Sequence, residues 1–231
     1  YEVHVLVRDA SNLTASDVGF ITIYNRIPNL VINEFMATSS AFGIPDNLTE
    51  YIEIYNMDDV SADLEGYVLQ SLDADGVPEE THLIEESVII DPHSYLLLIS
   101  DATPNLNIFG NIENYYSYNG DIILKDPINN NTDIETHIRL LNHEGNAVDE
   151  IGYNYNDMWN MLLEPASSNS AAIELLSPVL DNNAAQNWAV SESSFGSWGL
   201  LGTPGSTNSA PNLYGDPFIN EYSLSFSGSG D

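Results

Sequence analysis

Residues 31–35 read VINEF, and the same pattern returns as FINEY at residues 218–222. Both copies combine apolar residues with one Asn-Glu pair and end on an aromatic ring, which is typical of the opening strand of a module. Each copy also follows a proline-containing stretch, at residues 27–29 and 209–212. Repetition on this scale is typical of array proteins, whose modules serve reach, adhesion or assembly more often than catalysis.

Short β-rich segments extend on both sides of VINEF. Residues 1–9 and 18–25 flank a turn-rich stretch and predict a β-hairpin. From residue 30 onward, segments such as EYIEIYN, SYLLLIS and HIRLLN are separated by Asn, Asp, Gly, Pro and Ser clusters. Glycine-containing turns at residues 73–76 and 142–146 predict two further hairpins. Only residues 156–163 show a helical period, and they predict one or two turns. The sequence therefore predicts an all-β sandwich.

The charge balance excludes several classes of protein. With 4 Lys and Arg against 35 Asp and Glu, the net charge is −31, which repels phosphates and excludes nucleic-acid binding through a basic face. The same charge attracts cations and is also typical of proteins from salty water. The hydrophobic fraction of 43% predicts a folded chain rather than a disordered one. No cysteine is present, so no disulfide forms, and no apolar run is long enough for membrane insertion.

Several phrases in order resemble the bacterial lamin-tail domain: VINEF, EYIEIYN, DLEGYVLQSLDADG, SYLLLIS, HIRLLNHEGNAVDEIGY, AIELLSPVLDNNAAQNWAVS and GTPG. The resemblance covers residues 29–208. It implies an immunoglobulin-like β-sandwich of the kind found in secreted and surface proteins. We therefore expect residues 1–27 to be the C-terminal hairpin of a preceding Ig-like module. Residues 28–208 would form the sandwich, and residues 209–231 a linker and the first strand of a following module.

Catalytic motifs are absent from the sequence. There is no HExxH pairing, no GxSxG elbow, no phosphate-binding glycine loop and no cysteine nucleophile. The sequence therefore predicts a protein that is not an enzyme.

Calcium is the metal that the loops suit best, because Ca²⁺ takes oxygen ligands from Asp, Asn and backbone carbonyls. Three loops supply such residues; they are Asp58, Asp59 and Asp63, then Asp73 and Asp75, and then Asp181 and Asn183. The same residue types also dominate plain turns, where they form local hydrogen bonds. Both interpretations remain open at this point.

Two glutamates, Glu34 and Glu53, lie within apolar strands, and strand alternation predicts that they face solvent. Tyr115 and Tyr116, with nearby Tyr118, are expected to be exposed and resemble in composition a loop that contacts sugars or proteins. The second INE copy supplies further contact residues. They are Phe218, Ile219 and Tyr222.

These observations predict a structural or adhesion module of a multidomain secreted or cell-surface protein, prokaryotic and from a marine or salty setting. Its partners would be neighbouring modules or subunits of the same protein, joined into filaments or arrays by strand pairing. Two alternatives stay open: an accessory domain of an extracellular nuclease or phosphatase, and a carbohydrate-binding module that contacts surface glycans.

Overall fold

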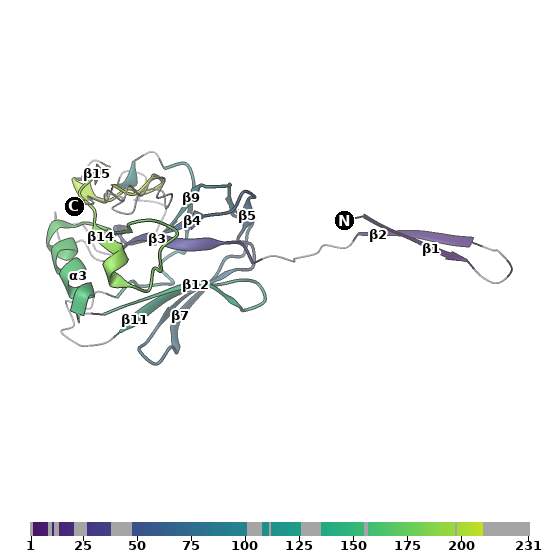
Figure 1. The fold of residues 1–231 in the computed structure, drawn as a ribbon, viewed down its shortest axis with the longest axis horizontal. Coiled ribbons are helices and arrows are strands. Elements are labelled where there is room, and N and C mark those ends of the chain that lie inside the picture. The colour runs from purple at the N-terminus through teal and green to yellow at the C-terminus, as the bar shows by residue number, and fades with distance from the viewer. Residues whose placement is uncertain are drawn as a thin grey trace, which may run out of the picture.

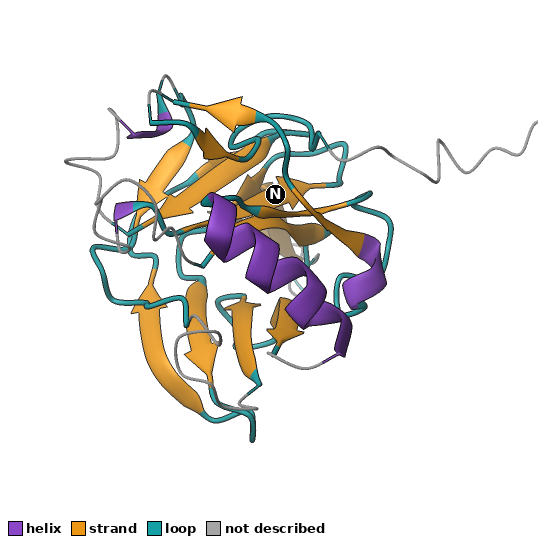
Figure 2. Ribbon diagram, turned by 90° about the vertical axis from the view of Figure 1, so that its left-hand side faces the viewer, coloured by secondary structure: helices purple, strands orange, loops and turns teal. Residues whose placement is uncertain are grey.

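The computed structural model describes residues 2–8, 11, 14–20, 27–37, 48–100, 108–110, 112–125, 135–154, 157–196 and 198–209. Within residues 27–209, two β-sheets pack face to face and a helix lies along one side of them (Figures 1 and 2). The predicted all-β sandwich is therefore confirmed. None of the described helices is long and apolar enough to span a membrane.

The larger sheet has six strands. From one edge to the other they are β10 (Tyr115–Ser117), β9 (Tyr95–Ile99), β4 (Tyr51–Asn56), β3 (Leu30–Met36), β13 (Ile173–Leu175) and β14 (Trp188–Val190). All neighbours are antiparallel except β10 and β9, which are parallel. VINEF lies in β3 and EYIEIYN in β4, so the two phrases that dominate the sequence form the centre of this sheet.

The smaller sheet has four antiparallel strands. They are β12 (Ala147–Tyr153), β11 (Thr136–Leu141), β6 (Val68–Leu72) and β7 (Pro78–Leu83). Both predicted hairpin turns are present, with Gly76 at φ 75° and Gly145 at φ 79°. This left-handed backbone region favours glycine, which explains why a glycine stands at these positions in the two turns.

Short elements complete the described chain. β1 (Glu2–Arg8) and β2 (Thr14–Phe20) form the predicted N-terminal hairpin, with Glu2 opposite Phe20. The remaining pieces are the pair β5 (Ala62–Asp63) and β8 (Ile89–Ile90), the pair β15 (Ser194–Phe195) and β16 (Leu200–Leu201), and the 3₁₀ helix η2 (Ala185–Asn187).

The main core lies between the two sheets. Ile32, Ile54, Leu69, Ile138 and Ile151 are buried there, each at most 1% exposed. Their strands alternate apolar side chains toward the partner sheet, as a sandwich requires. Burial of apolar surface on this scale is the main favourable term in folding.

An aromatic cluster closes one end of this core. The Phe35 ring lies 5.0 Å from the Tyr153 ring, 6.4 Å from the Trp159 ring and 5.5 Å from the Trp188 ring. Tilted and edge-on pairs at these distances are favourable beyond their buried area. Four separate segments of the chain meet at Phe35.

The helix α3 (Asp157–Asn169) is longer than the one or two turns predicted over residues 156–163. Trp159, Leu163 and Ala166 lie at helical spacing and are buried against the core. Tertiary packing of this face stabilises a helix that local sequence would support only weakly. Figure 2 shows α3 along one side of the sandwich.

Asp149 of β12 joins the two sheets at the β3 bulge. Its Oδ2 accepts hydrogen bonds from Ile32 N at 2.6 Å and Asn182 Nδ2 at 2.7 Å. Burial raises the pKa of Asp149 to about 6, although these hydrogen bonds act in the opposite direction. The Asn182 carbonyl in turn accepts from Trp188 Nε1 at 2.7 Å, so this loop folds back and places the indole over the core edge.

The outer face of the larger sheet is also covered. A second apolar cluster contains Met36, Tyr51, Leu97, Phe109 and Leu200, all at most 6% exposed. The central strands of this sheet are therefore buried on both faces.

Candidate functional site

Three glutamates lie side by side on the outer face of the larger sheet. Glu34 of β3 is opposite Glu53 of β4 on one side and Glu174 of β13 on the other. All three are 0% exposed. Strand alternation does direct Glu34 and Glu53 away from the main core, as expected. The prediction that they face solvent is wrong, because a later part of the chain covers them.

Residues 203–209, which we call the latch segment, form that cover. Each glutamate accepts a hydrogen bond from one main-chain N–H of the latch segment. The three bonds are Thr203 N to Glu34 Oε1 at 2.8 Å, Gly205 N to Glu53 Oε2 at 2.6 Å and Ser209 N to Glu174 Oε2 at 2.5 Å. The latch segment is therefore held at three points along the row of glutamates.

A pair of asparagines, Asn33 and Asn208, holds the latch segment further. Asn208 Nδ2 donates to the carbonyls of Asn33 at 3.1 Å and Leu175 at 2.7 Å, and its Oδ1 accepts from Asn33 Nδ2 at 2.8 Å. The Asn33 amide also donates to Glu53 Oε1 at 2.9 Å. Asn33 sits at the bulge of β3, where an extra residue alters the register with β4. The bulge thus aims a polar side chain at the latch segment.

Tyr51 fills the space beneath Gly202, just before the latch segment. Its hydroxyl donates to Glu34 Oε1 at 2.5 Å. A Cβ at Gly202 would lie 2.5 Å from the Tyr51 oxygen and 2.8 Å from Glu34 Oε1. Only glycine fits this close approach of the backbone to the buried hydroxyl and carboxylate.

The electrostatics of the three glutamates follow from their burial. Desolvation raises the pKa of Glu34 to about 7, opposed by hydrogen bonds from Tyr51 and Thr203 and reinforced by the charge of Glu174. Desolvation also raises the pKa of Glu53 well above its ordinary value, with Glu34 adding to the effect. Like charges in a low-dielectric site disfavour full ionisation. Glu34 and Glu53 therefore bind protons more readily than exposed carboxylates do.

Metal coordination does not suit these glutamates. Their oxygens already accept N–H and O–H donors of the chain itself. Among the residues that the structure describes, no group of three or more His, Asp or Glu side chains could hold a metal ion.

The predicted calcium ligands lie in three separate loops. Asp58 and Asp63 line one open cleft of about 830 Å³ beside residues 27 and 28. Asp58 Oδ2 accepts from Asn29 N at 3.0 Å, and Asp63 Oδ1 accepts from Val88 N at 3.1 Å. Asp59 pairs with His93 at 2.9 Å. These contacts join the loop to distant segments of the chain, and Asp63 Oδ1 also accepts a local bond from Glu65 N at 3.1 Å, as the plain-turn interpretation expects.

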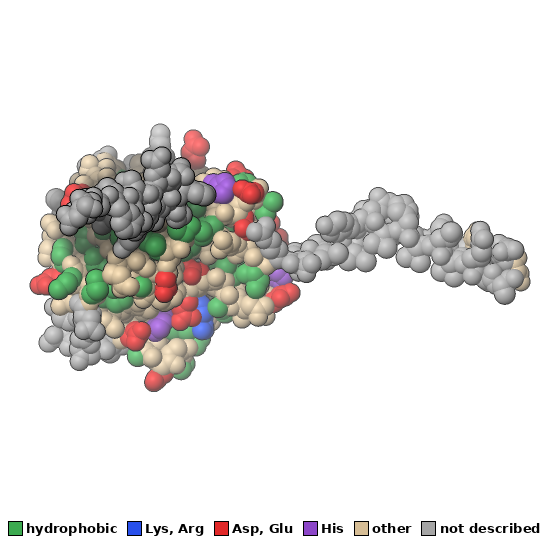
Figure 3. Space-filling view, viewed as in Figure 1, with side chains coloured by type: hydrophobic (Ala, Val, Ile, Leu, Met, Phe, Trp, Pro, Cys, Tyr) green, Lys and Arg blue, Asp and Glu red, His purple; other side chains and the backbone are tan. Residues whose placement is uncertain are grey.

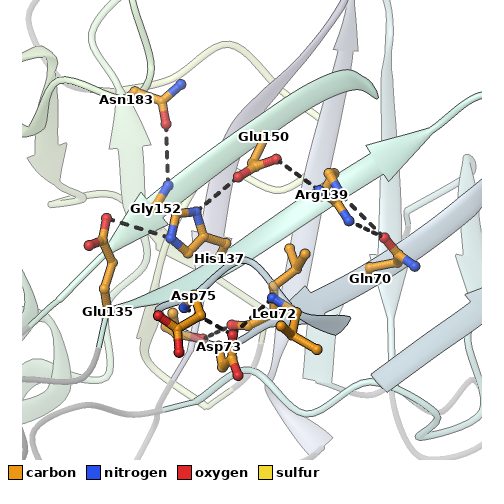
Figure 4. Close-up of polar contacts among 12 residues, drawn as sticks. Gln70, Leu72, Asp73, Asp75, Glu135, His137, Arg139, Glu150, Gly152 and Asn183 are labelled. Carbon is orange, nitrogen blue, oxygen red and sulfur yellow. Dashed lines mark hydrogen bonds and ion pairs between the residues drawn. The ribbon is translucent and has the colours of Figure 1, made fainter. Parts of the chain in front are cut away.

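The other four candidates also form local bonds. Asp73 Oδ1 accepts from Asp75 N at 3.0 Å within the β6–β7 turn. Asp181 Oδ1 accepts from Asn183 N at 3.0 Å, and Asn183 Oδ1 accepts from Gly152 N at 3.3 Å. Figure 4 shows Asn183 beside β12 and the Asp73 turn at the end of β6. Calcium binding by any of the seven residues remains a prediction.

A polar network covers the outer face of the smaller sheet (Figure 4). Arg139 donates to Gln70 Oε1 at 2.8 Å and lies 3.6 Å from Glu150 Oε2, while His137 Nδ1 is 3.0 Å from Glu150 Oε1. His137 also lies 3.6 Å from Glu135. Figure 3 shows blue, purple and red side chains close together on one part of the visible surface. The network neutralises charge locally, and sequence analysis did not single it out.

The predicted tyrosine loop is largely packed. Tyr118 is 0% exposed, which contradicts its expected exposure, because it fills the core. Tyr115 and Tyr116 are half-buried in β10, and the Tyr116 hydroxyl lies 2.9 Å from His82 Nε2. The remaining predicted contact residues lie outside the described residues. They are Phe218, Ile219 and Tyr222.

Sequence analysis missed Glu174 and the latch segment. One signal was available: in INEF, YIEI and IELL, a glutamate lies within a mostly apolar strand. Three such glutamates in a chain with few cations indicate a shared set of buried donors.

Comparison with known protein families identifies most of the sandwich. The family model of the Lamin Tail Domain matches residues 25–155, more than half of the chain. The match contains Glu34 and Glu53 but ends before α3, Glu174 and the latch segment. A comparison with curated proteins gave no match.

Proposed function

Because this chain belongs to the lamin tail domain family, an immunoglobulin-like fold, we propose that it is a structural module that links neighbouring modules in series. In this proposal it carries no active site, belongs to a multidomain secreted or cell-surface protein, and assembles into filaments or arrays through strand pairing. The family resemblance and the strongly acidic surface support the extracellular setting.

One observation carries the proposal: the sandwich is fastened where the chain enters it and where it leaves. At the start, Asn29 N donates to Asp58 Oδ2 at 3.0 Å, and Met57 N donates to the Asn29 carbonyl at 2.9 Å. At the other end, Ser209 bonds to Glu174 through both its N–H and its hydroxyl. Fixed ends transmit orientation and load to neighbouring modules, which a freely hinged domain would not do.

Strand pairing has a candidate surface in β7, an edge strand of the smaller sheet. Most of its side chains are exposed, and Leu83 is 47% exposed. An edge strand presents N–H and C=O groups to which an extended segment can add. The proposed donor is the FINEY segment, residues 218–222, of another copy.

We expect the full chain to form concentration-dependent polymers, seen by sedimentation velocity and electron microscopy. Deleting residues 212–231, or replacing Leu83 with aspartate, should abolish them, because each change removes one side of the pairing. Val179→Asp, at an exposed site in the loop before η2, is the matched control and should assemble normally. Polymers that survive both changes would contradict the strand-pairing proposal, and a chain that stays monomeric at every concentration would contradict assembly.

Calcium is a second proposal that can be tested directly. If the Asp-rich loops bind Ca²⁺, an ion concentration ten times the dissociation constant stabilises the native state by about 1.4 kcal/mol. For a chain of this size, that raises the melting midpoint by about 3–6 °C. Calorimetry with Ca²⁺ and with chelator measures the shift. Identical midpoints in both would argue against a calcium site.

A further inference from the structure

The hydroxyl of Thr203 lies among more acceptors than it can serve. Thr203 Oγ1 is 2.9 Å from Glu34 Oε2, 3.3 Å from Glu174 Oε2 and 3.5 Å from Asn208 Oδ1. A hydroxyl has one proton to donate and can accept from a second donor. If both glutamates were ionised, one of these close oxygen pairs would have no hydrogen between its atoms.

Among the described residues, the groups that face Glu34 and Glu53 are acidic or neutral. Facing the cluster are Glu53 and Tyr51 from β4 and the Tyr95 hydroxyl of β9, which lies 3.4 Å from Thr207. Residues 198–209 contain no ionisable side chain. Within the described part of the chain, no Lys, Arg or His forms an ion pair with Glu34 or Glu53. Buried like charges without a counter-charge are strongly unfavourable.

We propose that Glu34 and Glu174 share one proton through the Thr203 hydroxyl, so that the latch segment is closed in the protonated state and loosens when that proton leaves. In the closed state, Glu34 Oε2 carries the proton and donates it to Thr203 Oγ1. The Thr203 hydroxyl then donates its own proton to Glu174 Oε2. Every close oxygen pair in this chain of bonds then contains one hydrogen.

The direction of the pH dependence follows from Glu34. Desolvation raises its pKa from 4.5 to about 7, so the folded state binds this proton more tightly than the unfolded state does. The stabilisation is fully present below about pH 4.5 and is lost as the pH rises through about 7. The inference goes beyond the linking role and concerns a single chain. Its test therefore does not depend on whether the chain assembles.

Amide hydrogen exchange at Thr203, Gly205 and Ser209 tests the latch. We expect their protection, corrected for intrinsic exchange and compared with Ile54 in β4, to fall about tenfold or more between about pH 5.5 and 8.5, as a pKa shift of this direction requires. Glu34→Gln keeps a donor toward Thr203 at every pH, so its protection should stay constant. Glu164→Gln, on the exposed face of α3, is the matched control and should follow the wild type.

Two outcomes would overturn the proposal: flat protection in the wild type, or a fall in Glu34→Gln equal to that of the wild type. A second measurement needs no variant. Titration of the Glu34 carboxyl carbon by NMR should give a midpoint above about pH 6, well above an ordinary glutamate. A midpoint below that value for Glu34 would exclude the shared proton.

Discussion

Replacing Phe35 with alanine is expected to lower the free energy of unfolding by about 4 kcal/mol, near the upper end for large-to-small changes in a core. Phe35 is 0% exposed, and its ring contacts those of Tyr153, Trp159 and Trp188. Its loss leaves a cavity at the point where β3, β12, β14 and α3 meet. Urea denaturation followed by circular dichroism measures the change.

Met161→Ala is the control for this prediction. Met161 lies on α3 and is 74% exposed, so its truncation should change stability by less than about 0.5 kcal/mol. Phe35→Leu keeps most of the apolar volume and should fall between the two. A loss below about 1 kcal/mol for Phe35→Ala would mean that the aromatic cluster does not hold the helix to the sandwich.

The second large effect is expected for Gly202→Ala, which should lower stability by about 2–3 kcal/mol through overpacking. The new Cβ would lie 2.5 Å from the Tyr51 hydroxyl and 2.8 Å from the Phe195 ring. The Tyr51 hydroxyl cannot move without breaking its bond to Glu34. We therefore expect the variant to lose amide protection at the latch segment as well as overall stability.

Gly152→Ala provides the matched control. Its added Cβ would also be crowded, at 2.9 Å from His137 Cε1 and 3.0 Å from Glu135 Oε1. Those atoms end side chains that are partly exposed and can rotate into solvent, so the loss should stay below about 1 kcal/mol. If both glycine variants lose the same free energy of unfolding, crowding under the latch segment is no more destabilising than crowding at Gly152.

Local patterns in the sequence were sufficient to predict the strands and turns. Alternation located β3 and β4, and glycine located the turns at Gly76 and Gly145, because these features depend on neighbouring residues. The bend after Leu64 likewise has a local origin: Leu64 is 0% exposed, and Gly66 has φ 80°. Family resemblance then correctly indicated the sandwich as a whole.

The candidate site was not predictable in the same way. Burial of Glu34 depends on Thr203, a residue 169 positions later in the chain. Alternation gives the side of the sheet on which a residue lies, but not what covers that side. The full length of α3 likewise depends on core contacts of Trp159 and Leu163 rather than on local helix propensity.

The large sequence separation of these contacts has a consequence for folding during synthesis. Asn33 pairs with Asn208 across 175 residues, so the outer face of β3 stays open until almost the whole sandwich has left the ribosome. Contacts of such range slow folding, because a long loop must close before they form. Until then, the ionised glutamates keep this face of the nascent sheet hydrated and discourage premature association with other chains.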